Sequence, residues 1–292
     1  MPARLSSFHR HRGRLYRRGR RRSELMAARV NHVAIASDQY AINGRFYEAL
    51  FGMKPSSKPR PARSVVIGDG YVGMNCIPRR DGRYSGLDHF GIEVDDLDDT
   101  IARIQKFDSS LSAVKRPPIR PFAAYSAHDP DTNIFDLSQK SLGGQKDVYA
   151  ENEGGIAPRH ISHIALRTRH AERCAQFYVE VFGLTPLNRK DENFYLSDGR
   201  VTLMIIPWKI EDYYAQDPAR TGLDHIGFTV ESVEQVKKDL IFLTGENPHM
   251  RTRALGYGSE GEARLKLFQK CPLGCFHLTD IEGVHIDVGE AA

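Results

Sequence analysis

The chain has 292 residues, of which 40% are hydrophobic, and a formal net charge of +4 at pH 7. This length supports one large domain or two ordinary domains with proper cores. No apolar run approaches the length that spans a bilayer, which excludes a helical membrane protein and predicts a cytoplasmic location.

Residues 1–28 are predicted to be a basic, disordered extension. Residues 1–25 hold nine Arg and one Glu, a net charge of +8, which leaves −4 for the rest of the chain. Clustered arginines can bind phosphates, but no aromatic or periodic pattern accompanies them, and no apolar stretch follows, as a secretory signal requires. A transit peptide and a true start at Met26 stay open as alternatives, and no nucleic-acid partner is expected.

The first half of the chain is predicted to contain two successive units, each with one strand, one helix and three strands. Residues 30–36 alternate like a strand, and 44–51 carry apolar residues at helical spacing before the helix stop at Gly52. The remaining strands of this unit are expected near Met53, at 64–67 and at 71–77. The second unit is expected as a strand at 86–94, a helix at 97–107, and strands near 112–115, 122–127 and 133–137.

The second half is predicted to copy this order. Its third unit is expected as a strand at 160–167, a helix at 171–182, and strands at 184–188, 193–196 and 200–206. Its last unit is expected as a strand at 222–230, a helix at 233–242, a poorly patterned stretch to about residue 270, and strands at 275–279 and 284–288. The glycine-containing polar segment 143–158 reads as a linker, so the domains are predicted to be 29–142 and 159–292.

A sequence repeat supports this division into halves. The segment Gly-Leu-Asp-His-Phe-Gly at 86–91 recurs at 222–227 with Ile in place of Phe, and 31–35 is echoed by 162–166, a shift of 131 positions. A fixed spacing of this kind marks a duplicated unit. Equivalent residues therefore occupy equivalent places in the two halves.

The four cysteines, Cys76, Cys174, Cys271 and Cys275, predict no disulfide framework in a chain of this length. Cys271 and Cys275 are spaced like half of a metal site, but no second pair accompanies them. We therefore predict a reduced loop at this position.

The repeated His-containing segments, together with Asp-Pro-Asp-Thr-Asn-Ile-Phe-Asp at 129–136, resemble the vicinal oxygen chelate superfamily. That family includes glyoxalase I, the bleomycin and fosfomycin resistance proteins and the type I extradiol dioxygenases, and the resemblance covers residues 30–288. It implies an α+β fold in which two βαβββ modules curve into one incomplete barrel around a metal. Four modules would then form two tandem barrels.

The resemblance also implies two sets of metal ligands. They are His163, His225 and Asp287 in the second half and His32, His89 and Asp136 in the first. Two imidazoles and one carboxylate suit a divalent transition metal with open positions; Fe(II) is expected first, with Mn(II) or Zn(II) as alternatives. A histidine in a strand can also serve only as hydrogen-bonded structure, so two metal sites, one or none stay open.

The glyoxalase pattern takes a fourth ligand, a carboxylate, from the last strand of the other module. The corresponding residues, 73–76 and 203–206, contain no carboxylate. This favours a three-ligand site, as in the extradiol dioxygenases and the fosfomycin thiol transferases.

The end of the chain keeps the frame of the extradiol dioxygenase signature, with four departures. His277 stands where the signature has Tyr, Ile281 stands for Pro, Asp287 replaces Glu, and residues 268–270, beginning with Phe268, occupy the window of an upstream His. His277 is predicted to be the acid/base residue, because imidazole titrates near neutrality. His285 alternates with Asp287 and is predicted to support the site, and Tyr257 is a candidate substrate contact from a glycine-flanked loop.

These features predict a non-haem metal-dependent dioxygenase of the extradiol type. Its partners would be dioxygen and a small substrate with neighbouring oxygens, such as an aromatic diol, and a homo-oligomer is expected. Two alternatives stay open: a metal-assisted lyase, isomerase or thiol transferase like glyoxalase or the fosfomycin resistance proteins, and a non-enzymatic binding protein of the bleomycin-resistance kind.

Overall fold

The computed structural model describes residues 28–56, 64–117, 123–139, 157–188, 191–209, 221–253, 255, 258–271 and 273–291. The predicted extension 1–28 (apart from its last residue), most of the predicted linker 143–158, and Tyr257 lie outside the described residues. In the part of the chain that is described, no helix is long and apolar enough to cross a membrane.

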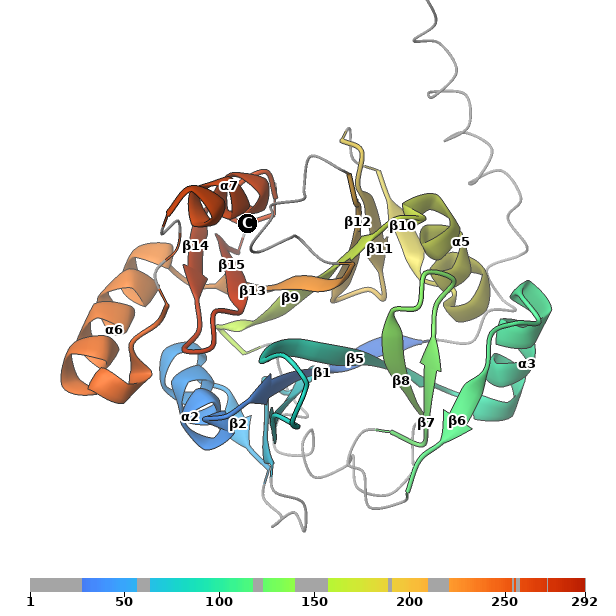
Figure 1. Cartoon of the computed structure of the whole chain (residues 1–292), viewed down its shortest axis with the longest axis horizontal. Coiled ribbons are helices and arrows are strands. Elements are labelled where there is room, and N and C mark those ends of the chain that lie inside the picture. The colour runs from blue at the N-terminus through green and yellow to red at the C-terminus, as the bar shows by residue number, and fades with distance from the viewer. Residues whose placement is uncertain are drawn as a thin grey trace, which may run out of the picture.

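The first half forms one mixed sheet of eight strands in the order β2-β3-β4-β1-β5-β8-β7-β6 (Figure 1). Strands β1 and β5 pair antiparallel in its middle and join the two modules. The strands are β1 (Arg29–Ser37), β2 (Lys54–Pro55), β3 (Val65–Gly68), β4 (Gly73–Pro78), β5 (Gly86–Val94), β6 (Ala113–Lys115), β7 (Tyr125–His128) and β8 (Ile134–Gln139), and the helices are α2 (Tyr40–Phe51) and α3 (Leu97–Phe107).

The second half repeats this topology in a sheet of seven strands, in the order β10-β11-β12-β9-β13-β15-β14. A counterpart of β6 is missing among the described residues. The strands are β9 (His160–Thr168), β10 (Thr185–Leu187), β11 (Phe194–Ser197), β12 (Thr202–Pro207), β13 (Gly222–Val230), β14 (Phe276–Thr279) and β15 (His285–Glu290), and the helices are α5 (Ala171–Phe182), α6 (Val233–Glu246), the 3-10 turn η3 (Pro248–Met250) and α7 (Gly258–Phe268). The predicted α+β fold of tandem repeated modules is confirmed.

The poorly patterned stretch from 243 to about 270, for which no element was predicted, contains helical structure. Helix α6 continues through Gly245 to Glu246, and α7 occupies residues 258–268. The sequence of α7 hides a helix, because it contains two glycines and its apolar residues gather at one end. The helix is positioned by the tertiary contacts of its C-terminal end, which are described below.

The first helix also begins earlier than predicted, at Tyr40 rather than at Gly44. A Cβ atom at Gly44 would lie 2.6 Å from Val65 Cγ1. Gly44 therefore allows α2 to lie close against β3 and does not mark the start of the helix.

The two sheets lie back to back, with β5 beside β13 and the helices at the flanks (Figure 1). Helix α2 of the first half packs on α6 of the second, and α5 of the second packs on α3 of the first. At one such contact the rings of Phe51 and Phe228 stack with centroids 3.8 Å apart. Each half thus places a helix of its own in the core of the other.

In each sheet, one face packs into this shared core, and the side chains on the other face point away from the other half. Val33 and Ile35 of β1 belong to the core, so the alternation of a strand turns His32 to the face that points away from the other half, here called the outer face. The same reasoning places His163 on the outer face of the second sheet, because Ile164 is in the core. The candidate ligands therefore lie on two separate surfaces, one in each half.

Two candidate metal centres

The first centre (His32, His89 and Asp136) lies on three neighbouring strands of the outer face. The register pairs His32 with Gly91 and Gly91 with Asp136, which forms one row across β1, β5 and β8. His89 lies two residues before Gly91 and so shares its face. Asp136 Oδ2 is 3.3 Å from His89 Nε2 and 3.9 Å from His32 Nε2, and one donor atom of each residue lies within 4.8 Å of the others.

The second centre consists of His163, His225, Asp287 and Cys271. Its strands β9, β13 and β15 repeat the row of the first centre. Gly227 pairs with both His163 and Asp287, and His163 Nε2 lies 3.5 Å from Asp287 Oδ2. The imidazole rings of His163 and His225 meet edge to face with centroids 5.3 Å apart. The predicted ligands of each half are thus brought together within that half.

Cys271 is a fourth donor of the second centre that the sequence reading missed. Its Sγ lies 3.4 Å from His225 Nε2 and 3.4 Å from Asp287 Oδ2, and one donor atom from each of the four residues lies within 4.8 Å of the others. All four cysteines are free, but Cys271 lies among the donors of the second centre and not in an isolated loop. Two sequence signals point to it: its half-site spacing to Cys275, and its place just after the window in which the dioxygenase signature has a histidine.

The last glycine of the repeated segment has a specific steric role. A Cβ atom at Gly91 would lie 2.0 Å from His32 Cε1, and one at Gly227 would lie 1.8 Å from His163 Cε1. Real Cβ atoms do not approach other atoms so closely. The first histidine of each centre therefore lies flat across the neighbouring strand only because glycine stands there.

Acceptors behind the histidines fix which nitrogen faces the centre. His89 Nδ1 lies 2.6 Å from Asp88 Oδ2, and His225 Nδ1 lies 2.9 Å from Asp224 Oδ1. A carboxylate can only accept, so Nδ1 carries the proton and Nε2 offers a lone pair. His32 Nδ1 faces Asn31 Oδ1 at 2.8 Å, with the same result.

The ligand carboxylates are held at their second oxygen. In the first centre Ser126 Oγ donates to Asp136 Oδ1, and Arg116 Nε donates to Ser126 Oγ at 2.7 Å. In the second centre His277 occupies the register position of Ser126, and its Nε2 lies 3.1 Å from Asp287 Oδ1.

Charges in the first centre indicate a cation site. Burial lowers the pKa of His32 to about 3. Burial also acts to lower the pKa of His89, but Asp136 and Asp88 outweigh it and raise that pKa to about 9. Burial acts to raise the pKa of Asp136, but His89 and His32 outweigh it and lower that pKa to about 2. Without a metal, a proton on His89 supplies the positive charge that a divalent cation would bring.

The second centre also fits a cation. Asp287 is fully buried, with His277 Nε2 3.1 Å from its Oδ1 and Cys271 Sγ 3.4 Å from its Oδ2. Burial acts to raise the pKa of Asp287, but His277 and the two histidine ligands outweigh it and lower that pKa. Burial of a charged carboxylate is costly, and a metal ion beside it would offset the negative charge.

Helix α7 covers the second centre through Phe268, which is 2% exposed. The Phe268 ring centroid lies 5.0 Å from that of His225, 4.5 Å from that of His277 and 4.9 Å from that of His285. His285 shares the outer face of β15 with Asp287, because Ile286 between them is in the core. In the first half α3 and β7 are joined by residues 108–124, which include β6, whereas the connection from α6 to β14 is longer, residues 247–275.

Asn75 and Met204 occupy the same position in the two halves, on the strands where the glyoxalase pattern has its carboxylate. Asn75 pairs with Ala34 and Met204 with Ala165. Asn75 Oδ1 is buried and has no hydrogen-bond partner among the described residues, whereas Met204 Sδ lies 3.7 Å from Cys271 Sγ.

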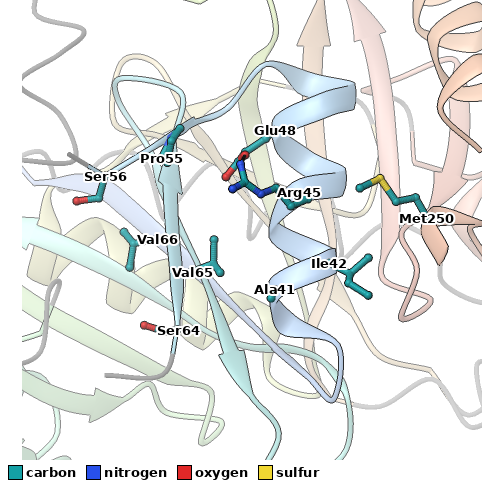
Figure 2. Close-up of a pocket in the computed structure, with 10 residues that line it drawn as sticks. All are labelled: Ala41, Ile42, Arg45, Glu48, Pro55, Ser56, Ser64, Val65, Val66 and Met250. Carbon is teal, nitrogen blue, oxygen red and sulfur yellow. Dashed lines mark hydrogen bonds and ion pairs between the residues drawn. The ribbon is translucent and has the colours of Figure 1, made fainter. Parts of the chain in front are cut away.

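A cavity of about 450 Å³ lies elsewhere, between α2 and β3 (Figure 2). Arg45 and Glu48 of α2, Val65 of β3 and Met250 contribute to its lining. Its lining includes no candidate ligand of either centre. The cavity therefore does not identify the site of chemistry.

The sequence of residues 29–137 and 160–247 matches the family model of the Glyoxalase/Bleomycin resistance protein/Dioxygenase superfamily. These two ranges contain both histidines of each centre. No curated protein matches the chain in sequence.

Solved structures share the fold over most of the chain. The 2,3-dioxygenase LapB from Pseudomonas sp. KL28 is 16% identical with a TM-score of 0.60, covering 90% of this chain and 92% of its own. The Mn(II)-bound glyoxalase from Novosphingobium aromaticivorans is 17% identical with a TM-score of 0.57, covering 91% and 82%. A catechol 2,3-dioxygenase is 11% identical with a TM-score of 0.58, covering 92% and 89%. At these identities the likeness concerns the fold.

Proposed function

Because the chain belongs to the glyoxalase/bleomycin resistance protein/dioxygenase superfamily, we propose that it is a metal-dependent enzyme. Its proposed reaction is the extradiol-type oxidation, by dioxygen, of a small substrate with two neighbouring oxygens, such as a catechol. Dioxygenases among the structures of similar fold support the reaction class.

The observation that carries this proposal is the convergence of two imidazole nitrogens and one carboxylate oxygen in each half. Such a set holds a divalent metal and leaves positions for a chelating substrate. Neither Asn75 nor Met204 adds the carboxylate of a four-ligand glyoxalase site.

The residues have distinct proposed roles. His32, His89 and Asp136, or their counterparts in the second half, would hold the ion. Fe(II), when bound there, supplies a Lewis acid for the substrate oxygens and a redox partner for dioxygen. Asp88 keeps the proton of His89 on Nδ1, so that Nε2 stays a lone-pair donor.

His277 and Ser126 are proposed to orient the ligand carboxylates, because each lies against the second oxygen of the aspartate in its half. A proton-carrying role for His277 would require its imidazole to reach the substrate as well. The Phe268 ring lies against that imidazole, with centroids 4.5 Å apart. The acid/base role of His277 therefore stays a prediction.

Two side chains are available to a substrate at the first centre. Asn75 Oδ1 could accept a hydrogen bond from a substrate hydroxyl, because it is buried and lacks a partner among the described residues. Arg116 is half-buried and uses Nε for Ser126, and its two Nη groups have no hydrogen bond within the described part of the chain. A substrate with an acidic group beside its diol would pair with this guanidinium.

The test is anaerobic loading of the intact protein with Fe(II), followed by metal quantification and oxygen uptake with a panel of catechols. We expect stoichiometric iron and oxygen uptake that is lost when the ligand histidines are changed to alanine. Stoichiometric metal without oxygen uptake, but with turnover of a hemithioacetal or an epoxide, would replace the oxygenase with a metal-assisted isomerase or transferase. Absence of bound metal would favour the binding-protein alternative.

A further inference from the structure

We propose that Cys271 is the fourth ligand of the second centre, which makes it a closed His/His/Asp/Cys site for a thiophilic divalent cation such as Zn²⁺. The first centre is then left as the substrate-binding site. The assignment of substrate binding to the first centre rests on the proposed function, whereas the assignment of Cys271 as a metal ligand does not.

The distances in the second centre match the edges of a tetrahedral site. Donor atoms about 2.0–2.3 Å from a common ion in tetrahedral geometry lie roughly 3.3–3.8 Å from one another. Cys271 Sγ is 3.4 Å from His225 Nε2 and 3.4 Å from Asp287 Oδ2. His163 Nε2 is 3.5 Å from Asp287 Oδ2.

The thiol is held in this place by its surroundings. The backbone N–H of Cys271 donates to the carbonyl oxygen of Phe268 at 2.9 Å, which turns the chain back at the end of α7. Its side chain packs in a small buried cluster with Ala165, Tyr195 and Met204. On its other side the sulfur lies beside His225 Nε2 and Asp287 Oδ2, and in the metal-free protein its S–H donates to Asp287 Oδ2.

The loop that carries the thiol is also shaped for the carboxylate. A Cβ atom at Gly274 would lie 1.9 Å from Asp287 Oδ1. Glycine at this position therefore lets the loop close over Asp287 and bring Cys271 beside it.

The second centre is closed to a substrate. Its donors are 3% exposed at His163, 1% at His225, 6% at Cys271 and 0% at Asp287, and the ring of Phe268 lies against His225. A four-ligand site with a thiolate, sealed from solvent, has the character of a structural metal site.

The first centre differs in its donor set. The connection 108–124 between α3 and β7 contains no Cys or His, and its one carboxylate, Asp108, pairs with Arg173. The three donors of the first centre are also buried, with 1% exposure at His32, 9% at His89 and 4% at Asp136, but the carboxylate behind His89, Asp88, has a side chain that is 45% exposed, whereas that of its counterpart Asp224 is 3% exposed. A set of three donors without a thiolate leaves coordination positions for substrate.

Cobalt spectroscopy of the intact protein tests the assignment independently of activity. Bound Co(II) shows a sulfur-to-cobalt charge-transfer band in the near ultraviolet when a thiolate is a ligand. We expect two Co(II) ions per chain and this band in the wild type. Cys271→Ser should abolish the band and keep the ion at the first centre, and Cys275→Ser, which changes an exposed cysteine in the same loop, should keep both.

The proposal is overturned if the wild type binds two Co(II) ions without the band, binds only one, or keeps the band in Cys271→Ser. Matching far-ultraviolet circular dichroism of the metal-free wild type and Cys271→Ser shows that both are folded. If Cys271→Ser does not fold, Cys271→Ala with the same measurement takes its place. Oxygen uptake separates the two proposals. A protein that shows the band but no turnover would confirm Cys271 as a ligand and would contradict the proposed oxygenase function.

The same experiment tests which centre binds substrate. With Fe(II) loaded, His89→Ala should lose the oxygen uptake of the wild type, whereas Cys275→Ser, at an exposed cysteine, should retain it. Oxygen uptake retained by folded His89→Ala with an empty first centre would overturn the assignment of substrate binding to the first centre.

Discussion

Tyr47 of the first half donates a hydrogen bond to Asp280 of the second half, with 3.1 Å between its hydroxyl oxygen and Asp280 Oδ2. The reciprocal contact exists as well, from Tyr178 of the second half to Asp129 Oδ2 of the first, also at 3.1 Å. Both tyrosines are fully buried. The duplicated halves thus hold each other at two equivalent points of their shared core.

Removing one of these hydroxyls should lower stability without changing the centres. Tyr47→Phe is expected to cost about 1–3 kcal/mol in the free energy of unfolding, because a buried carboxylate loses a donor. Chemical denaturation measures this, and metal content should stay that of the wild type. Tyr40→Phe, at a half-buried tyrosine of α2 whose hydroxyl makes no hydrogen bond among the described residues, is the control and should change neither; a Tyr47→Phe protein as stable as the control would show that the bond contributes nothing.

Asp280 should make the metal-free protein less stable as pH rises. Burial raises its pKa from 3.8 to about 6, against the hydrogen bonds that it accepts. The folded state therefore holds this proton more tightly than the unfolded state, and the stabilisation is present below about pH 4 and is lost as pH rises through about 6. A shift of this size corresponds to about 3 kcal/mol.

The measurement is the unfolding free energy of wild type minus that of Asp280→Asn, determined by denaturation across this pH range in the presence of a chelator. The difference should fall by about 3 kcal/mol between pH 4 and pH 7. Asp38→Asn, at an exposed residue paired with Arg79, should show no such trend. A difference that is constant with pH, or that rises, would contradict the prediction.

Adding one methyl group at Gly227 should empty the second centre selectively. The Cβ atom would overlap the imidazole of His163 at 1.8 Å and displace this ligand, so Gly227→Ala should bind one metal ion per chain in place of two. Metal analysis after dialysis decides this.

The matched control is Gly245→Ala, where no atom outside the helix's own backbone lies within 4 Å of the added Cβ. This variant should keep both ions and gain about 0.5–1 kcal/mol of helix stability. Two ions retained by Gly227→Ala would refute the steric role of this glycine.

Replacing the carboxylate behind His89 should weaken the first centre. Asp88→Asn keeps the shape of the side chain but removes the charge beside His89 Nδ1, so metal affinity at this centre should fall by about 10–100-fold. Competitive titration against a chelator measures the change. The second centre is the internal control, because Asp224 is untouched, and equal weakening at both centres would point to a global effect instead.

Opening the cover of the second centre should cost stability and speed metal release. Phe268→Ala removes a buried ring that touches three histidines, with an expected loss of about 3 kcal/mol. Zinc should also pass to a chelator faster from this variant than from the wild type. Phe242→Ala, at a residue that is 72% exposed on α6, should leave both quantities unchanged, and an unchanged release rate in Phe268→Ala would show that the ring does not seal the centre.

The sequence by itself determined the duplication, because the repeated segments and their spacing are visible in a chain without its fold. The two candidate ligand sets followed from the family resemblance that these segments carry. Strand alternation alone, a local period of two residues, places His285 on the same face as Asp287.

Only the tertiary structure decided what surrounds each centre. Cys271 and Phe268 reach the second centre at the end of α7, a helix whose own sequence pattern is weak and whose stability depends on packing. Asn75 and Met204 meet the centres across strands that are distant in sequence, and Tyr47 finds Asp280 across the interface of the halves. These relations depend on distances between remote residues, which no local pattern encodes, and they make two centres with the same triad chemically different.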